Sequence, residues 1–299
     1  MRHGRNSFRL RNAVEEIGKS MIIQWFPGHM TKALRQMEAS IAKVDSIVYV
    51  LDARAPLSCI NVQFEPLLER RSAVYVINKA DMVAPQDLRA WQQHFEREGK
   101  TVVASNSTTA RDAAKVVAAL HEVNREKIER NAQKGVQYSV KAMVIGMPNT
   151  GKSTLINSLA RDKRTVTGNR PGVTKGEQWI RLDNGIVLLD TPGTLCHSID
   201  VEQTAFNLAY IGCIRDAILD MEGLALKFLE QMTEWYPDAL RARYKVEPVG
   251  KAPLELYEEI AKVRGFVLKR GEIDYERTAA AVMDDFRKGR MGKIILEKP

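Results

Sequence analysis

The stretch VIGMPNTGKSTLI, residues 144–156, has the spacing G-x-x-x-x-G-K-S between an apolar β-type run and a helical pattern. Glycines in such a loop let backbone N–H groups surround phosphates, and the lysine sets a positive charge against the β- and γ-oxygens. The serine hydroxyl that follows is a ligand for Mg²⁺. We therefore predict a nucleotide phosphate loop formed by Gly146, Asn149, Thr150, Gly151, Lys152, Ser153 and Thr154.

A second motif indicates which base the bound nucleotide carries. VYVINKADMV, residues 74–83, places Asn78, Lys79 and Asp81 at the end of an apolar run. The Asp81 carboxylate can accept from N1–H and from the exocyclic amine of guanine, a donor pair that adenine lacks. Asn78 can bond the other edge of the base while the stem of Lys79 covers the ring. After the next strand, ASNS (104–107) predicts a further backbone contact to the base from Ser105 and Asn106.

Two further segments predict the metal and the γ-phosphate contacts. LLDTPG (188–193) puts Asp190 at a strand end, where it can hold Mg²⁺ through water, and leaves the Gly193 amide free for the γ-phosphate. NRPGVTKG (169–176) supplies Thr174, whose hydroxyl can ligate the same metal when GTP is bound. By itself that segment indicates an ordinary Pro-Gly turn, but its place between the phosphate loop and Asp190 favours the metal role.

The order of the motifs is unusual, because the base motif precedes the phosphate loop. Short β-branched runs at 45–53, 72–80, 100–106 and 140–146 alternate with helical patterns, which is typical of parallel βαβ units, and 177–190 indicates a hairpin around Asn184-Gly185. We predict an α/β fold: a circularly permuted P-loop GTPase domain with a mostly parallel sheet and helices on both faces, followed by a small all-α domain. The expected boundaries are 21–198 and 199–299, with 1–20 as a disordered tail or an extension ahead of a true start at Met21.

Composition narrows the class of protein. Lys and Arg number 45 against 37 Asp and Glu, an excess that suits a polyanionic partner but equally a solvated basic surface. The excess lies in residues 1–199, because 200–299 hold 16 basic and 18 acidic side chains. No apolar run approaches the roughly 18 residues of a membrane span. Cys59, Cys196 and Cys213 are too few and too widely spaced for a disulfide framework or a four-cysteine zinc site, which fits a reducing cytoplasm.

Several segments together carry a resemblance to a known family. They are QWFPGHMTKA (24–33), DARAP (52–56), NKAD (78–81), GMPNTGKS (146–153), TGNRPGVTKG (167–176) and DTPG (190–193). In permuted order ahead of a helical region, they resemble the ribosome biogenesis GTPase A family. The resemblance implies a monomeric, cytoplasmic bacterial factor that binds the immature large ribosomal subunit, hydrolyses GTP there and leaves. A mitochondrial relative is the alternative if residues 1–20 are a transit peptide. A nucleotide-gated module for another RNA or protein target is the alternative function.

The resemblance also bears on catalysis. Ordinary GTPases orient the attacking water with a glutamine directly after D-x-x-G, where this chain has Thr194. The family is thought to use the histidine of its PGHM segment instead, which corresponds to His29. From the residues alone, a histidine beside Trp25 and Phe26 is more often structural. The expected catalytic residues are therefore His29, Lys152 and Thr174.

Two expectations concern ions and RNA. Asn149 resembles the asparagine with which related GTPases hold K⁺ where an arginine finger would otherwise act, and a plain loop asparagine is the alternative. The resemblance assigns rRNA binding to the helical region. Basic clusters at 241–245, 262–270 and 286–293 are the candidates there, although a charge cluster is usually only a solvated face.

Overall fold

A single six-stranded sheet organises the first two thirds of the chain in a computed structural model, which describes residues 28–160, 178–195 and 201–299. The strands are β1 (Ser46–Asp52), β2 (Ser72–Asn78), β3 (Thr101–Ser105), β4 (Val140–Ile145), β5 (Gln178–Arg181) and β6 (Ile186–Asp190). Their order across the sheet is β3-β2-β1-β4-β6-β5. All neighbours pair in parallel except β5, which pairs antiparallel with β6 around the turn at Gly185. The predicted parallel units and the hairpin are confirmed.

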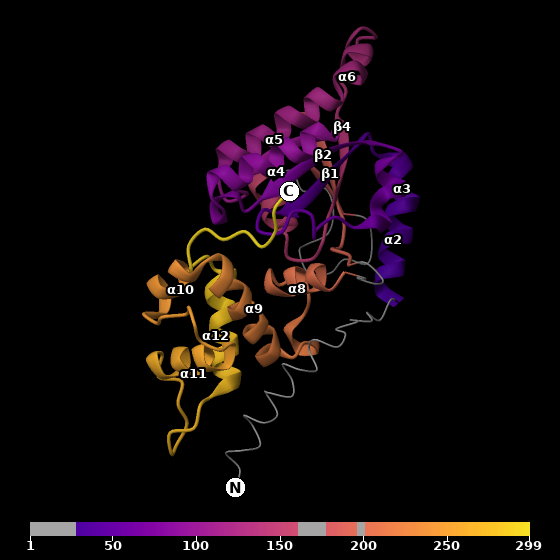
Figure 1. The fold of residues 1–299 in the computed structure, drawn as a ribbon. Helices are drawn as coiled ribbons and strands as arrows, with labels where there is room; N and C mark the ends of the chain where they lie inside the picture. The colour runs from indigo at the N-terminus through magenta and orange to yellow at the C-terminus, as the bar shows by residue number, and fades with distance from the viewer. Residues whose placement is uncertain (1–27, 161–177, 196–200) are drawn as a thin grey trace. The chain divides into compact units, whose positions relative to one another are not determined.

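Helices cover both faces of this sheet (Figure 1). Along β1 and β2 the valines face α5 and α7, and these apolar side chains form one buried cluster with Val116, Leu120 and Leu155. On the opposite face Tyr49 packs edge-on against Phe64, with ring centroids 5.5 Å apart. Successive side chains of a strand point to opposite faces of the sheet, which is why the valines and Tyr49 lie on different faces. The helices of this unit are α2 (Gly28–Ser40), α3 (Glu65–Leu68), α4 (Pro85–Arg97), α5 (Ala110–Val123), α6 (Arg125–Ala132) and α7 (Lys152–Leu159), with short 3₁₀ turns at Ile41–Lys43, Val62–Phe64 and Ala80–Met82.

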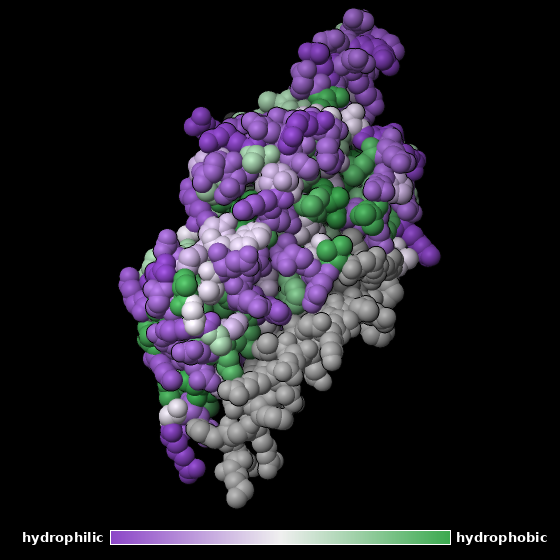
Figure 2. Space-filling model, viewed as in Figure 1, coloured by the Kyte–Doolittle hydropathy of each residue, from purple (hydrophilic) through white to green (hydrophobic). Residues whose placement is uncertain are grey.

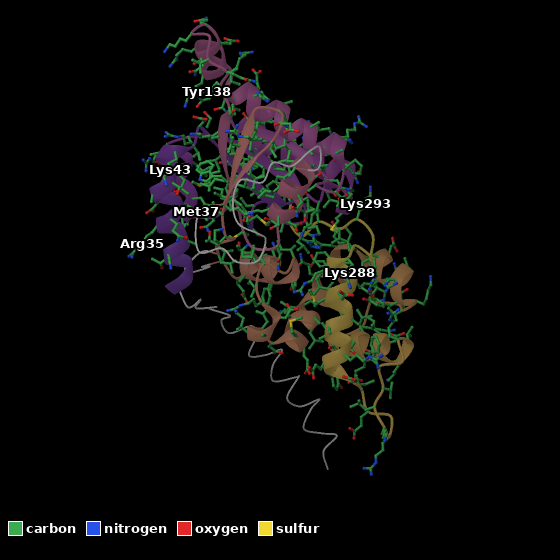
Figure 3. The ribbon with its side chains drawn as sticks, turned by 180° about the vertical axis from the view of Figure 1, so that it is seen from behind. Arg35, Met37, Lys43, Tyr138, Lys288 and Lys293 are labelled. Atoms are coloured by element: carbon green, nitrogen blue, oxygen red, sulfur yellow. The ribbon has the colours of Figure 1, made fainter. Side chains whose placement is uncertain are left out.

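Helices α2 and α6 differ in how much of their surface is buried. In α2, Met37 is 1% exposed and turns inward, whereas Arg35 faces solvent (Figure 3). Helix α6 has no buried residue in its length, and its surface is almost uniformly hydrophilic (Figure 2). It extends outward from α5, and only the partly buried Ile128 packs against the core cluster of the sheet.

The rest of the chain is helical. Its helices are α8 (Glu202–Tyr210), α9 (Met221–Trp235), α10 (Pro237–Tyr244), α11 (Pro253–Val263) and α12 (Tyr275–Arg287), with a 3₁₀ turn at Asp216–Ile218. Helix α9 contacts the other four, and Phe228 of α9 packs against Tyr210 and Phe286 with ring centroids 5.1 and 4.8 Å apart. A lone β-bridge joins Val267 to Ile273. The predicted all-α region is thus confirmed apart from this bridge.

The described chain divides into two compact units. We call residues 28–195 with 295–299 the GTPase unit, and residues 201–294 the helical unit. The last five residues belong to the first unit although they follow the second in sequence. No helix among the described residues is long and apolar enough to cross a bilayer.

Candidate functional site

The predicted site residues gather at the carboxyl ends of the parallel strands. β1 ends at Asp52, β2 at Asn78, β3 at Ser105 and β6 at Asp190, and the phosphate loop follows β4. In the sheet, β6 lies next to β4 on one side, and β1, β2 and β3 lie in that order on its other side. Ligands bind open α/β sheets outside the strand ends where the order reverses in this way. The topology therefore brings base and phosphate motifs together although their order in sequence is inverted.

The phosphate loop is shaped by close approaches that only glycine permits. Gly151 has φ = 98°, and a Cβ there would lie 2.1 Å from the side-chain nitrogen of Asn78. A Cβ on Gly193 would lie 2.7 Å from Lys152 Nζ and 2.8 Å from the Cα of Pro148. The D-x-x-G segment thus lies directly against the phosphate loop. Lys152 is 7% exposed, and its ammonium donates to the carbonyls of Gly146 and Met147 at 3.1 and 2.8 Å.

A cavity of about 1010 Å³ opens beside this loop. Burial raises the pKa of the Asp190 carboxyl in its wall, and the nearby charge of Lys152 partly offsets the effect. Helix α2 forms the other side of the cavity. The lining combines phosphate-binding and metal-binding groups predicted from sequence with α2 residues that were not predicted: Asn149, Lys152, Ser153, Asp190 and Gly193, together with Lys32, Gln36 and Met37.

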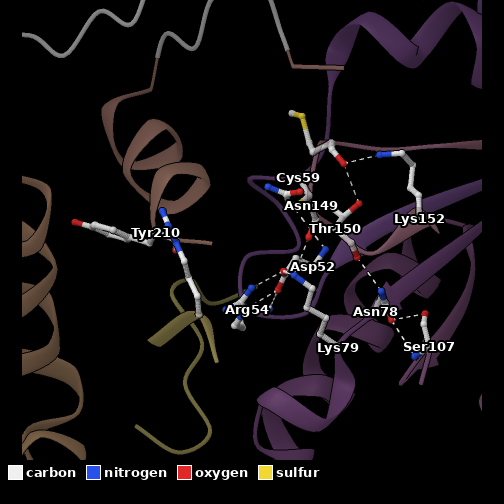
Figure 4. Close-up of polar contacts among 12 residues, drawn as sticks. Asp52, Arg54, Cys59, Asn78, Lys79, Ser107, Asn149, Thr150, Lys152 and Tyr210 are labelled. Atoms are coloured by element: carbon white, nitrogen blue, oxygen red, sulfur yellow. Dashed lines mark hydrogen bonds and ion pairs between the residues drawn. The ribbon is translucent and has the colours of Figure 1, made fainter. Parts of the chain in front are cut away.

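Asn78 makes contacts on both sides of the site. Its amide nitrogen donates one N–H to the carbonyl of Thr150 at 2.8 Å, and its amide oxygen accepts from Ser107 N and Oγ at 3.1 and 2.6 Å (Figure 4). The side chain is 2% exposed. Asn78 therefore ties the phosphate loop to the loop after β3. Its amide has a second N–H, and the contact to the edge of the base stays a prediction.

The loop after β3 is held by its own hydrogen bonds. The Asn106 backbone N–H donates to Asp112 at 2.9 Å, and the Asn106 side-chain oxygen accepts from Thr108. Ser105 is fully buried and its hydroxyl has no hydrogen-bond partner. Ser107, which was not predicted as a site residue although it belongs to the same ASNS stretch, binds Asn78 of the base motif. The backbone contact from Ser105 and Asn106 to the base stays a prediction.

The other base residues lie where a ligand can reach them. Asp81 is exposed in the 3₁₀ turn after β2. Lys79 adopts the left-handed conformation at φ = 58°, and its ammonium donates to the carbonyl of Asn149 at 2.8 Å. Its stem thus crosses from the base motif to the phosphate loop. Such a strained backbone at a non-glycine residue is typical of a functional site.

Sequence reasoning missed a buried charge network behind Lys79. The Lys79 ammonium lies 2.7 Å from the Asp52 carboxylate, which Arg54 also binds through Nε at 2.9 Å and Nη2 at 2.8 Å. Burial by itself raises the pKa of Asp52, but Arg54 and Lys79 outweigh it and hold the pKa well below its usual range. Asp52 and Arg54 belong to the DARAP stretch (52–56) at the end of the buried β1. That stretch helped to indicate the family, but the sequence did not predict a role for Asp52 or Arg54.

The arrangement suits Mg²⁺. The exposed Ser153 hydroxyl and the Asp190 carboxylate line one cavity, and hard oxygen donors are what Mg²⁺ prefers. No cluster of three or more His, Cys, Asp or Glu occurs among the described residues. Thr174 lies outside the described residues. Helix α2 begins at Gly28, but the His29 side chain is also outside what the structure describes.

Thr194, at the position of the usual glutamine, points away from solvent. It is 1% exposed and its hydroxyl has no hydrogen-bond partner, while its carbonyl accepts from the Asn61 amide at 3.5 Å. A side chain buried in this way does not reach a water in the cavity. Asn149 in contrast is exposed beside the cavity and has φ = 59°.

Comparisons with known proteins agree with this geometry. A family described as 50S ribosome-binding GTPase matches residues 141–236. Ribosome biogenesis GTPase A of Bacillus licheniformis is 37% identical over 280 residues, which span 93% of this chain and 99% of that protein. Mitochondrial ribosome-associated GTPase 1 of Bos taurus is 31% identical and spans 93% and 89%. A crystal structure of GNP-bound YlqF from T. maritima matches with a TM-score of 0.62 at 26% identity, covering 90% of this chain and 98% of that one.

Fold and site together define a circularly permuted P-loop GTPase. The family match begins within β4 and so omits the upstream base motif at 78–81, as the permuted order leads one to expect. With relatives at 37% identity along nearly their whole length, the chain belongs to the ribosome biogenesis GTPase A family.

Proposed function

We propose that this chain is an assembly factor for the large ribosomal subunit, which binds the immature particle with GTP, hydrolyses the GTP there and leaves with GDP. The observation that carries the proposal is the 37% identity over 99% of a protein named Ribosome biogenesis GTPase A. The family description, 50S ribosome-binding GTPase, supports the large subunit as the partner. The same role favours a monomer that acts in the cytoplasm, where bacterial ribosomes assemble.

The site supports the chemistry of GTP hydrolysis residue by residue. Lys152 and Gly193 line the cavity in which the phosphates would bind, and the exposed Asp81 would read the guanine edge. Ser153 and Asp190 are the groups that would hold Mg²⁺, with Thr174 as a further ligand in the GTP state. Mg²⁺ supplies neutralisation of the charge that develops on the β- and γ-oxygens. Asn149 is the residue that would hold K⁺ near the same oxygens.

We also propose that the helical unit contacts rRNA, and the ion pairs favour one of its three basic clusters. In 241–245, Arg241 pairs with Glu247 and Arg243 with Asp285. In 286–293, carboxylates bind Arg287, Lys288 and Arg290. In 262–270, by contrast, Lys262, Lys269 and Arg270 are exposed, and within the described part of the chain no carboxylate pairs with them. Unneutralised cations are the ones that attract phosphates.

Turnover with purified subunits tests the proposal. GTP hydrolysis should rise when large ribosomal subunits are added and should not rise with small subunits. Cosedimentation with large subunits should be stronger with a non-hydrolysable GTP analogue than with GDP. Stimulation by a different RNA or protein, with none by large subunits, would replace this function with that of a nucleotide-gated module for another target.

Two variants locate the parts of the mechanism. Replacing Lys269 and Arg270 by alanine should weaken cosedimentation and leave intrinsic hydrolysis unchanged. Lys227→Ala removes a cation that pairs with Glu230, and it should leave both cosedimentation and hydrolysis unchanged. His29→Ala should lower the stimulated kcat by about 100-fold, the lower end for a general acid–base or positioning group, with little change in nucleotide affinity. A stimulated rate within about twofold of wild type would exclude a catalytic His29.

A further inference from the structure

The carboxyl-terminal tail lies against the loop that follows β1. Ile295 and Leu296 are 3% and 2% exposed, and the Leu296 N–H donates to the carbonyl of Arg54 at 2.8 Å. These residues come directly after the helical unit, yet they pack as part of the GTPase unit. The tail is thus an ordered element of the unit that contains the nucleotide site.

Glu297 closes this contact with several hydrogen bonds. Its carboxylate accepts from the backbone N–H groups of Leu57 and Ser58 and, at 2.6 Å, from the Ser58 hydroxyl. Its own carbonyl accepts from Trp91 Nε1 of α4 at 3.4 Å. Hydrogen bonds to an ionised carboxylate are about twice as strong as neutral ones. Glu297 therefore holds the 54–58 loop against the body of the GTPase unit.

This loop leads directly to the nucleotide site. Arg54, whose carbonyl the tail binds, is 2% exposed, and its guanidinium binds both oxygens of Asp52. Asp52 binds Lys79 at 2.7 Å, and Lys79 donates to the carbonyl of Asn149 in the phosphate loop at 2.8 Å. Figure 4 shows the path from Arg54 through Asp52 and Lys79 to Asn149. Each step is a direct contact between charged or polar groups.

We propose that Leu296 and Glu297 are positioning residues of the guanine-nucleotide site, which act through Arg54, Asp52 and Lys79. The proposal rests on the nucleotide-binding role proposed above for Lys79 and the phosphate loop. Arg54 is tightly enclosed, so a shift of its backbone moves its guanidinium, and the Asp52 carboxylate follows. Lys79 then changes its place between the base and the phosphate loop. The tail in this way adjusts nucleotide affinity without touching the nucleotide.

Glu297→Gln tests the first step, because it keeps the size of the side chain and removes its charge. We expect the dissociation constant for GDP with a fluorescent ribose label to rise about three- to ten-fold, the range in which changes along a contact network alter coupling between sites. KM for GTP should rise with it while kcat at saturation stays the same. Glu230→Gln is the matched control, since Glu230 is an exposed partner of Lys227 in the helical unit.

A double-mutant cycle with Lys79→Met separates positioning from general stability. Methionine keeps the apolar stem over the ring and removes only the ammonium through which the tail is proposed to act. We expect Glu297→Gln to change GDP affinity in the wild-type background and to have no effect in the Lys79→Met background. Equal effects in both backgrounds, or an effect that scales with a lowered Tm, would overturn the proposal in favour of a structural tail.

The variants also separate failure of the proposed tail role from failure of the proposed nucleotide site. Weaker GDP binding in Lys79→Met, with no change in Glu297→Gln, would remove the tail's role and leave the site in place. Unchanged binding in both variants would also overturn the tail's role, whereas retained GTP affinity in Lys152→Ala would overturn the site itself. Ser58→Ala adds an independent check, because it deletes the hydroxyl that Glu297 binds and should reproduce part of the Glu297→Gln effect.

Discussion

Two arginine–carboxylate pairs of nearly the same geometry, each with a buried carboxylate, lie in the two units of this protein; the Arg54 side chain is 2% exposed and that of Arg243 is 24% exposed. In the GTPase unit Arg54 binds Asp52 through Nε at 2.9 Å and Nη2 at 2.8 Å, and in the helical unit Arg243 binds Asp285 at 2.8 and 2.6 Å. The carboxylates are 0% and 1% exposed. For both, burial alone raises the pKa, and the arginine contacts outweigh burial and leave the pKa lowered.

The pairs differ in their third partners. Asp52 also binds Lys79, which reaches the phosphate loop. Asp285 also accepts from the Tyr244 hydroxyl and from Arg290, each at 3.1 Å, so its contacts join the end of α10 to the end of α12. A buried ion pair therefore does not by itself indicate a functional site. Its position relative to the strand ends separates the pair that we propose to act on the nucleotide site from the pair that joins two helices.

The largest expected effect is on folding of the helical unit. Asp285→Ala removes a buried carboxylate that accepts from Arg243, Tyr244 and Arg290, and we expect it to lower the free energy of unfolding by about 3 kcal/mol, because several hydrogen bonds to one charged group are lost together. Urea unfolding followed by circular dichroism measures this. The neighbouring Asp284→Ala, which removes exposed pairs with Lys288 and Arg290, should cost less than about 1 kcal/mol. A loss of GDP affinity in folded Asp285→Ala protein would contradict the separation of the two pairs.

The next effect concerns nucleotide binding alone. Lys152→Ala removes a buried ammonium from the phosphate loop, and we expect GTP affinity to fall by about 100-fold or more, as when a preorganised donor is removed from a phosphoryl site. Titration with a fluorescent GTP analogue measures it. Lys115→Ala, which breaks an exposed pair with Asp112, serves as the control. Retained affinity would place the nucleotide elsewhere.

The expected change in preference between guanosine and xanthosine nucleotides on mutating Asp81 is smaller. Asp81→Asn reverses the hydrogen-bond polarity toward N1 and the exocyclic group of the base, so preference should move from guanosine to xanthosine nucleotides by roughly 10- to 100-fold, the usual value of one bidentate base contact. Competition between GDP and XDP measures the ratio of the two affinities. Asp87→Asn on the neighbouring α4 is the control and should leave this ratio unchanged. If Asp81→Asn still prefers GDP as wild type does, another residue reads the base.

The smallest effect is a pH dependence shared by both pairs. Because the pKa values of Asp52 and Asp285 are lowered in the folded protein, their contribution to stability is present above the unfolded pKa, about 3.9, and is lost as pH falls below it. Unfolding free energies at pH 7 and pH 3 should therefore differ less for Asp285→Asn than for wild type. An equal difference in the two proteins would mean that Asp285 contributes nothing to the acid sensitivity.

Much of the fold was predictable because its signals are local. Alternation of β-branched runs with helical patterns predicted the parallel strands, and Asn184-Gly185 predicted the hairpin between β5 and β6. The permuted order came from the motifs alone. The contacts of Asn78 with Ser107 and of Asn106 with Asp112 were not predictable, because motif spacing does not encode which side chains of neighbouring loops meet.

What the sequence by itself determined is the chemistry of the nucleotide, since the phosphate loop and the NKAD motif are short and each carries its function in adjacent residues. What only the tertiary structure decided is how those motifs are supported. The Asp52–Lys79 pair joins two neighbouring strands, and the Leu57–Glu297 contact joins residues 240 positions apart. Such contacts depend on how strands and tail pack in space, because side chains far apart in sequence leave no common periodic pattern from which their meeting could be read.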